Sequence, residues 1–319
     1  MITVLRAPPF ATVQDLGRTG HLHAAVPRAG ALDPFALALA NILVGNGPNS
    51  AAVEWGLAGG EVRFEQDATI AITGARAQAA LGGRPVPHCE AARAAAGDVL
   101  AIERIEAGAW VYLAVAGGIN VPEVLGSRST YLPGRFGGME GRLLRAGDHL
   151  PVGRPSTAAP AAEGPTSIPS RREAIAELAD PRPANPIAVL PGPDLGLLPS
   201  AAWRWLVETE FRVSRAVSRM GYRLEAPSPA FPLPGDLPSA PACVGTVQLP
   251  PGGEPIVLMP DGPTVGGYLR IAVVASPDVG RLAQRRPGEA VRFQEIGLRE
   301  ARAGLQRRWS LLERVAESA

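Results

Sequence analysis

The sequence is divided into short apolar runs that glycine and proline separate. Runs such as TIAITGA, WVYLAVAGGI, PIAVLPGP, EPIVLMP and YLRIAVVA are rich in valine, isoleucine and aromatic residues. Proline cannot donate to the ladder of a central strand and glycine supplies turns, so this punctuation is typical of short antiparallel strands. The chain contains 37 glycines and 33 prolines. We therefore predict a mainly β fold whose sheets close into barrels or sandwiches.

Only a few segments show a helical pattern. ALDPFALALANILVGN has Asp33 as a candidate cap, Pro34 in its first turn and Gly45 as a stop signal. PSAAWRWLV is a shorter candidate with Ser200 as its cap. The segment LREARAGLQRRWSLLERVAES has apolar residues at helical spacing, which predicts a helix near the C-terminus.

The chain divides at a stretch of different composition. Residues 154–185 are rich in alanine, proline and serine and contain one short helical piece, which indicates a linker or crossover. A weak repeat relates residues 95–105 to residues 286–296, each a glycine-acid turn that leads into an alternating strand. We therefore predict an N-terminal β domain over residues 1–153 and a C-terminal β domain with a terminal helix over residues 186–319.

The charge of the chain excludes several classes of partner. The sequence has 31 basic and 30 acidic residues, for a net charge of +1. Because no basic stripe appears, neither nucleic acid nor an anionic membrane surface is an expected partner. Every basic residue is arginine, so the chain has no phosphate-loop lysine, no Schiff-base lysine and no lysine to carry biotin. If ATP or biotin is used, another chain supplies that lysine.

Cysteine and histidine give no metal or disulfide pattern. Cys89 and Cys243 lie far apart in unlike contexts, and the 4 histidines are scattered. We expect no metal site. The N-terminus MITVLRAPPF is too short and too broken by proline for a signal peptide, and no long apolar run follows. We therefore expect a cytoplasmic protein.

The stretch PDGPTVGGYLRIA combines an acid, hydroxyls, paired glycines and an arginine between two apolar runs. The preceding GTVQLPPGGEPIVLM predicts a hairpin whose second strand leads to Asp261. Glycines at Gly266 and Gly267 would allow a planar ligand to approach the backbone closely. Asp261 at a strand end could orient a group or accept a proton. A plain hairpin turn is the alternative, but it needs fewer polar groups.

Two other motifs place arginines near glycine. In TVQDLGRTG, Asp15 and Arg18 flank a tight turn. We interpret them as a surface pair that stabilises the turn, with carboxylate binding by Arg18 as the alternative. In SRMGYRL, Arg219 and Arg223 would share one face if the segment is a strand. An internal network of ion pairs is somewhat favoured there over an anion site.

A glycine-rich loop over residues 117–142 is the remaining candidate. Ser127 and Ser129 stand on it beside Arg128, and a glycine-rich run follows. Such a loop can bind phosphate or carboxylate through its backbone N–H groups. An irregular surface loop is an equally good interpretation.

Five blocks together resemble one family. In order they are TVQDLGRTGHLHAAVPRAGALDPFALALANILVGN, YLAVAGGINVPEVLGSRST, GGMEGRLLRAGDHLP, SRMGYRL and PIVLMPDGPTVGGYLRIA. This arrangement resembles the biotin-dependent carboxyltransferase family, which includes allophanate hydrolase subunit 2-like (urea amidolyase-related) proteins and the C subunit of 5-oxoprolinase. The resemblance covers nearly the whole chain except residues 154–185.

The resemblance implies two cyclophilin-like β-barrel domains and a partnered enzyme. The implied function is the ATP-dependent opening of 5-oxo-L-proline to L-glutamate, together with two partners. These are a subunit 1-like protein, which resembles the B subunit of 5-oxoprolinase, and a protein that resembles its A subunit. One alternative is the carboxyltransferase half of a urea carboxylase or allophanate hydrolase-type enzyme, with biotin carried on another chain. The other is a non-catalytic partner that regulates a kinase-inhibitor protein.

The resemblance also implies site residues. The expected catalytic residues are Asp261, Thr264 and Tyr268. We expect Asp261→Asn to leave folding intact and to abolish turnover. The expected substrate-binding residues, with the two serines added from the glycine-rich loop, are Gly266, Gly267, Arg219, Tyr222, Arg223, Arg270, Ser127 and Ser129.

The chain departs from the usual family pattern at five positions and in residues 239–245, where SAPACVG replaces a typical Ser-Glu-Gly segment. The family usually reads Ser-Asn-Arg-Met-Gly-Tyr-Arg, and Val217 and Ser218 stand here in place of the serine and the asparagine. It usually reads Asp-x-Gln-Thr-Thr-Gly-Gly-Tyr-Pro, and this chain has Pro263, Val265 and Leu269 in place of Gln, the second Thr and Pro. Because several of the missing groups are polar, these departures bear on substrate identity and on activity.

Overall fold

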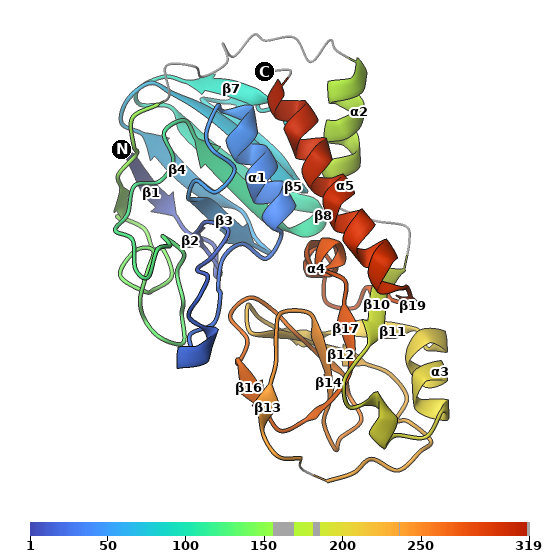
Figure 1. The fold of residues 1–319 in the computed structure, drawn as a ribbon. Helices are drawn as coiled ribbons and strands as arrows, with labels where there is room; N and C mark the ends of the chain where they lie inside the picture. The colour runs from blue at the N-terminus through green and yellow to red at the C-terminus, as the bar shows by residue number, and fades with distance from the viewer. Residues whose placement is uncertain (156–168, 181–185, 236, 318–319) are drawn as a thin grey trace. The chain divides into compact units, whose positions relative to one another are not determined.

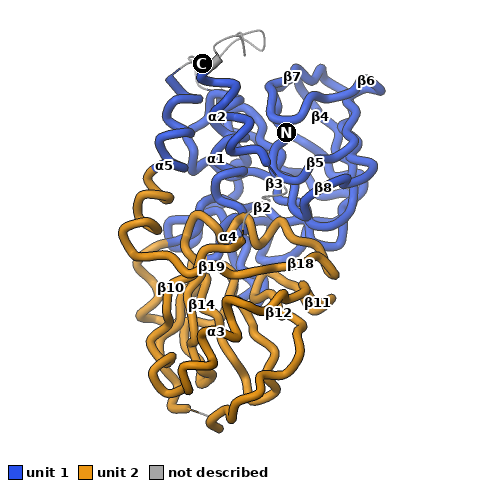
Figure 2. Tube along the Cα trace, turned by 90° about the vertical axis from the view of Figure 1, so that its right-hand side faces the viewer, with its two compact units in different colours: residues 1–18, 29–182, 307–319 blue, residues 19–28, 183–306 orange. Residues whose placement is uncertain are grey.

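The computed structural model describes residues 1–155, 169–180, 186–235 and 237–317. It confirms a mainly β chain, with sheets that form a half-barrel and a nearly closed barrel. Two compact units are present (Figure 2): unit 1 holds residues 1–18, 29–182 and 307–319, and unit 2 holds residues 19–28 and 183–306. The sequence predicted a single division at residues 154–185. It did not predict that residues 19–28 belong to unit 2 and residues 307–319 to unit 1.

Unit 1 is built on one large antiparallel sheet. Its main path runs β2-β3-β8-β4-β1-β9, and β5 pairs with β6, β7 and β8. The long strands β5 and β8 pair with each other, and β8 also pairs with β3 and β4, which makes β8 the central strand of the sheet. The strands are β1 (Ile2–Arg6), β2 (Thr12–Gln14), β3 (Ala52–Gly56), β4 (Gly60–Phe64), β5 (Ala68–Leu81), β6 (Arg84–Pro85), β7 (Ala91–Ala94), β8 (Val99–Val115) and β9 (His149–Leu150).

Helix α1 (Pro34–Leu43) lies against β5 and β8 in this unit (Figure 1). The Asp33 carboxylate accepts a hydrogen bond from the Ala36 amide at 3.1 Å, which confirms the predicted cap. The part of α5 (Leu298–Glu317) that belongs to unit 1 packs on α1, with the Trp309 and Phe35 ring centroids 5.5 Å apart. This aromatic contact ties the C-terminal part of α5 to unit 1.

Unit 2 has a second sheet, in the order β18-β11-β12-β15-β14-β17-β10-β19. All its pairings are antiparallel except β10 with β19, which is parallel. Two short strands, β13 and β16, pair separately. The strands are β10 (Ile187–Pro191), β11 (Phe211–Val217), β12 (Gly221–Glu225), β13 (Ala240–Pro241), β14 (Thr246–Leu249), β15 (Ile256–Leu258), β16 (Val265–Gly266), β17 (Leu269–Val274), β18 (Ala290–Val291) and β19 (Phe293–Glu295).

The helices outside α1 agree only partly with the sequence pattern. Helix α3 (Ala201–Glu208) is present, but the Ser200 side chain makes no cap hydrogen bond, because its backbone is already helical. Helix α4 (Ser276–Ala283) was not predicted, since SPDVGRLA is too short to show a clear period. Of the expected crossover 154–185, the helical piece is α2 (Pro169–Leu178), and residues 156–168 and 181–185 lie outside the described residues.

Two short 3₁₀ helices complete the elements, η1 (Leu22–Ala24) and η2 (Leu195–Leu197). Within the described part of the chain, no helix combines the length and apolar character needed to cross a membrane.

Candidate functional site

A hairpin in unit 2 carries the acid of the candidate site. Strands β14 and β15 pair antiparallel, with Val247 opposite Val257, which confirms the hairpin predicted from the Pro-Pro-Gly-Gly turn. Asp261 follows β15 closely, and the chain then passes through β16 into β17. The short strands place the acid, the hydroxyl groups and the paired glycines within the one connection between β15 and β17, the two strands that flank β14.

Asp261 forms a buried ion pair with Arg219. Arg219 Nε lies 3.0 Å from Asp261 Oδ2, and Nη2 lies 2.9 Å from Oδ1. The side chains are only 3% and 1% exposed, respectively. The Asp261 amide also donates to the Arg219 carbonyl at 2.9 Å. Side-chain and backbone bonds therefore fasten the loop before β12 to the end of β15.

Arg219 and Arg223 do not share a strand face, contrary to the condition considered for SRMGYRL. Strand β12 begins at Gly221, so Arg219 lies in the preceding turn while Arg223 lies on the strand. Arg223 instead forms a half-exposed pair with Glu254, with Nη1 3.0 Å from Oε2. The buried hydroxyl of Tyr222, between them in sequence, donates to the Ala283 carbonyl at the end of α4 at 2.8 Å.

Arg270 already holds a carboxylate of the protein. Its Nε and Nη2 lie 2.7 and 2.9 Å from the two carboxylate oxygens of Asp194, and its Nη1 donates to the Pro241 carbonyl at 2.6 Å. The hydrogen bonds from Arg270 lower the pKa of the Asp194 carboxyl. A substrate carboxylate at Arg270 would have to compete with Asp194.

The paired glycines lie where the backbone approaches another segment closely. The Leu237 amide donates to the Gly267 carbonyl at 3.1 Å, and the Ala242 amide donates to the Thr264 carbonyl at 2.9 Å. A Cβ atom at Gly267 would lie 2.9 Å from the Leu237 carbonyl oxygen, closer than real side chains come. Next to this turn, the Tyr268 side chain is 43% exposed, which leaves its phenol open to a ligand.

Ser127 and Ser129 lie in unit 1, whereas the other predicted site residues lie in unit 2. Both hydroxyls donate to the Asp15 carboxylate, at 2.7 and 2.5 Å. The amides of Arg128 and Gly17 donate to the same carboxylate, at 2.6 and 2.8 Å. The serines are fully buried. These bonds hold the loop on Asp15, and substrate binding by the two serines stays a prediction.

The interpretation of Asp15 and Arg18 as a surface pair was wrong. Both side chains are buried. The Arg18 guanidinium donates to the Ser129 carbonyl at 2.6 Å and lies over the Phe136 ring, 4.9 Å from its centroid. Local sequence could not show this, because the partners come from the glycine-rich loop more than a hundred positions away.

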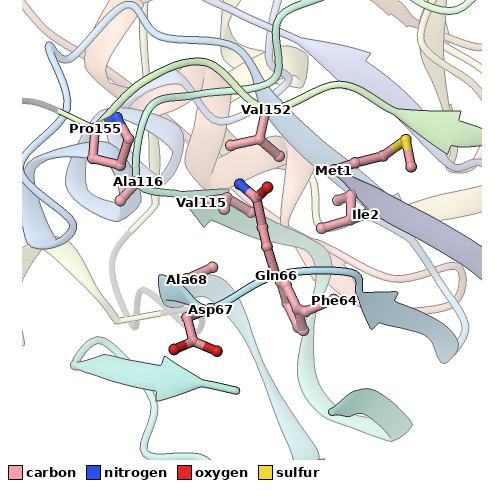
Figure 3. A pocket seen from close by; sticks show the side chains of 10 residues that line it. All are labelled: Met1, Ile2, Phe64, Gln66, Asp67, Ala68, Val115, Ala116, Val152 and Pro155. Atoms are coloured by element: carbon pink, nitrogen blue, oxygen red, sulfur yellow. The ribbon is translucent and has the colours of Figure 1, made fainter. Parts of the chain in front are cut away.

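A small pocket in unit 1 contains none of the predicted site residues (Figure 3). Its walls are mostly apolar, with Gln66 and Asp67 as the polar members. Figure 3 shows the Gln66 amide pointing between Val152 and Val115. The Asp67 carboxylate accepts a hydrogen bond from the Ala96 amide at 2.9 Å. The pocket offers little for chemistry on a polar substrate.

Sequence reasoning did not single out Gln248 on β14. Its side chain is buried beside the glycine turn of the candidate site. The one available signal was a polar residue inside the apolar strand GTVQLP.

Known proteins resemble this chain over most of its length. Residues 24–295 match the family described as carboxyltransferase domain, subdomain A and B. The chain is 37% identical to the C subunit of 5-oxoprolinase from Escherichia coli (strain K12), over 99% of this chain and 98% of the relative. It is 35% identical to the C subunit of 5-oxoprolinase from Haemophilus influenzae, over 94% of this chain and 93% of the relative.

Larger proteins match through a part of their length. Urea amidolyase of Lachancea kluyveri is 32% identical over 92% of this chain but only 17% of that protein. The crystal structure of the Kluyveromyces lactis urea carboxylase superposes with a TM-score of 0.88 and 28% identity, over 98% of this chain and 29% of that chain. The K. lactis urea amidolyase gives a TM-score of 0.87, over 98% of this chain and 20% of that chain.

Proposed function

The chain belongs to the carboxyltransferase family of subdomains A and B, and on this basis we propose that it is the C-subunit-like component of a 5-oxoprolinase. The proposed reaction is the ATP-dependent opening of 5-oxo-L-proline to L-glutamate. The proposed partners are a subunit 1-like protein, which corresponds to the B subunit, and an A-subunit-like protein. The names of the relatives themselves imply an enzyme of several subunits.

The observation that carries this proposal is the extent of the match. This chain and the C subunit of the E. coli 5-oxoprolinase cover 99% and 98% of one another. The urea amidolyase relative is matched over only 17% of its length, so the match to the C subunit extends over far more of the relative.

The residues of unit 2 support chemistry on an amide. Ring opening places negative charge on the amide oxygen, and hydrogen-bond donors stabilise that charge. The Tyr268 phenol is exposed, Thr264 is partly exposed, and both adjoin the glycine backbone. These two groups are the proposed donors, and Asp261 with Arg219 orients the turn that carries them. Arg223 is the proposed site for the substrate carboxylate, because its present partner Glu254 is half-exposed.

The chain's composition supports a nucleotide site on another chain. With no lysine in the sequence, we propose that the ATP phosphates are bound by groups of a partner protein. The same argument places biotin, in the alternative carboxyltransferase function, on another chain.

The proposal is tested by reconstitution. The chain is co-expressed with its A-subunit-like and B-subunit-like neighbours, and ATP-dependent release of glutamate from 5-oxo-L-proline is measured. We expect turnover that disappears when this chain is omitted. Turnover that continues at the same rate without this chain, from the remaining subunits, would contradict a catalytic contribution.

Carboxyl transfer is the second candidate, and the structural match to urea carboxylase over 98% of this chain favours it. In that case the chain would act in carboxyl transfer from carboxybiotin to a urea nitrogen. A complex that incorporates labelled bicarbonate into a urea product, with biotin carboxylase and a biotin carrier present, would support it. A well-formed complex inactive in both assays would favour the regulatory function.

A further inference from the structure

Gln248 is a buried polar residue in the middle of β14. Its neighbours Val247 and Leu249 are buried apolar residues, and Gln248 itself is only 4% exposed. In the sheet it lies opposite Ile256 of β15 and Arg270 of β17. Its amide nitrogen has no hydrogen-bond partner among the residues that the structure describes.

An unpartnered buried amide is unusual in a folded protein. Buried polar groups normally have hydrogen-bond partners in the protein, because burial removes the water molecules that would otherwise bond to them. Gln14 in unit 1 differs at this atom, since its amide nitrogen donates to the Thr12 hydroxyl at 3.0 Å and to the Thr130 carbonyl at 3.2 Å, although its Oε1 has no partner among the described residues. The Gln248 amide nitrogen is thus a buried donor that a ligand could satisfy.

The amide lies under the glycine turn of the candidate site. A Cβ atom at Gly266 would stand 2.7 Å from Gln248 Nε2, so any side chain there would occupy the space directly over the amide. The adjacent residues Val265 and Tyr268 are 49% and 43% exposed. The Gly266 backbone therefore lies next to the amide. Pairing with β13 and the hydrogen bond from the Leu237 amide to the Gly267 carbonyl hold this backbone, so these bonds must break before the turn can lift away from the amide.

We propose that the Gln248 carboxamide binds the cis-amide edge of the substrate when the Gly266–Gly267 turn lifts. A primary carboxamide presents an N–H donor and a C=O acceptor side by side. A lactam or a urea presents the complementary pair on one edge, because its C=O and an N–H lie on the same side of the planar group. Two parallel hydrogen bonds then form in one ring and fix the plane of the reacting amide.

This inference rests on the proposed function for its location, and it deepens that function by naming the chemical class of substrate. 5-Oxo-L-proline and urea share the cis-amide edge. An N-methylated lactam keeps the carbonyl but lacks the N–H, so it can make only one of the two bonds. Loss of a buried hydrogen bond that leaves its partner unsatisfied lowers affinity by about tenfold or more.

The test is a binding cycle on the complex of this chain with its co-expressed partners. Calorimetry compares 5-oxo-L-proline with N-methyl-5-oxo-L-proline on the wild type and on Gln248→Met, which keeps the length of the side chain. We expect the wild type to prefer the N–H lactam by about tenfold or more, and Gln248→Met to reduce the preference to below about threefold. Gln294→Met is the matched control, since Gln294 is an exposed glutamine on strand β19 of the same unit, and it should keep the full preference.

The other possible results of the binding cycle bear on the inference and on the proposed function separately. An equal preference in the wild type and Gln248→Met, or no binding of any cis-amide by the wild type, overturns the inference. If Gln248→Met prevents assembly, Gln248→Glu is used with a different readout: the carboxylate still accepts from the lactam N–H but cannot donate to the lactam carbonyl, so both lactams should bind about tenfold or more weakly than to the wild type, and unchanged affinity for both overturns the inference. The complex could instead bind urea and not the lactam, and prefer urea over tetramethylurea only when Gln248 is present. That result would support a substrate with a cis-amide edge and would exclude 5-oxo-L-proline as the substrate. Glutamate release is assayed on the same samples, and its absence beside an intact cycle would contradict the proposed function alone.

Discussion

Arg219 and Asp261 hold one another through two parallel hydrogen bonds of 3.0 and 2.9 Å inside unit 2, although 42 positions separate them in sequence. A carboxylate with a guanidinium on both oxygens is already occupied by strong charge-assisted bonds. Asp261 is therefore better suited to hold the turn before Thr264 in place than to accept a proton from substrate. The distinction changes what its substitution should do.

We predict that Asp261→Asn lowers the free energy of unfolding by about 3–5 kcal/mol, because it leaves the Arg219 charge buried without its counter-ion. The sequence alone suggested that folding would survive this change intact. Denaturant unfolding of the purified variant measures the effect. The matched control is Glu254→Gln, which breaks the half-exposed pair with Arg223 and should cost below about 1 kcal/mol. An Asp261→Asn protein of unchanged stability that has lost all turnover would instead make Asp261 a directly catalytic residue.

Gly262→Ala should destabilise unit 2 by about 2 kcal/mol or more, because a Cβ atom there would lie 2.7 Å from the Met220 carbonyl oxygen and 2.9 Å from that of Met259. Both obstacles are backbone atoms, which cannot move aside as a side chain can. Gly252→Ala is the control, since nothing lies within 4 Å of its Cβ position, and it should change stability by less than about 1 kcal/mol. Thermal unfolding compares the two, and equal melting temperatures would show that the turn is not packed as described.

Asp15→Asn should lower the stability of unit 1 by about 2–4 kcal/mol. The carboxylate accepts hydrogen bonds from Ser127, Ser129 and two backbone amides. In the variant an NH₂ group would replace one oxygen and could not accept these bonds, so buried donors would be left without an acceptor. Asp67→Asn provides the control, because the Asp67 carboxylate lies at the surface and accepts its bond from the Ala96 amide. Hydrogen exchange of the Arg128 amide gives the local measurement. Slow exchange retained in Asp15→Asn would contradict the central role of this carboxylate.

Much of the fold could be predicted from local patterns. The hairpin of β14 and β15 follows from two apolar runs around Pro-Pro-Gly-Gly, and α1 follows from its cap at Asp33 and its continuous apolar run. Secondary structure of this kind depends on residues that are neighbours in sequence, so a local pattern contains the information.

The candidate site was less predictable because its contacts are long-range. Arg219 with Asp261, Arg270 with Asp194 and Asp15 with Ser127 all join segments that no periodicity relates. The residue types were recognised, but their assignment to ligand binding ignored partners within the protein. Gln248 escaped notice for the same reason, since only the structure places its amide beside Gly266.

The two cysteines should react very differently with a thiol reagent. Burial raises the pKa of the Cys89 thiol to about 12, whereas Cys243 is exposed. The thiolate is the reactive form, so iodoacetamide at about pH 8 should label Cys243 and leave Cys89 unmodified in the native protein. Mass spectrometry of the intact protein should show a single adduct, and Cys243→Ser should show none. Native labelling of Cys89 at the rate seen in denaturant would mean that β7 and its preceding turn open readily.

The ion pair of Asp194 with Arg270 should make unit 2 sensitive to acid. Hydrogen bonds from Arg270 lower the Asp194 pKa below its ordinary value of 3.8 in the folded protein. A group whose pKa is lower when folded adds stability above its unfolded pKa and loses that stability as the pH falls through the folded pKa. We therefore expect Asp194→Asn to cost about 1–2 kcal/mol at about pH 6 to 8, a value reduced for partial exposure of the pair, and progressively less below about pH 4. Unfolding of the wild type and the variant across this range measures the difference, with Glu254→Gln as an exposed control that should cost less than about 1 kcal/mol at every pH. A difference that grows on acidification would have the wrong sign for a salt-bridged carboxylate and would exclude this pair as its source.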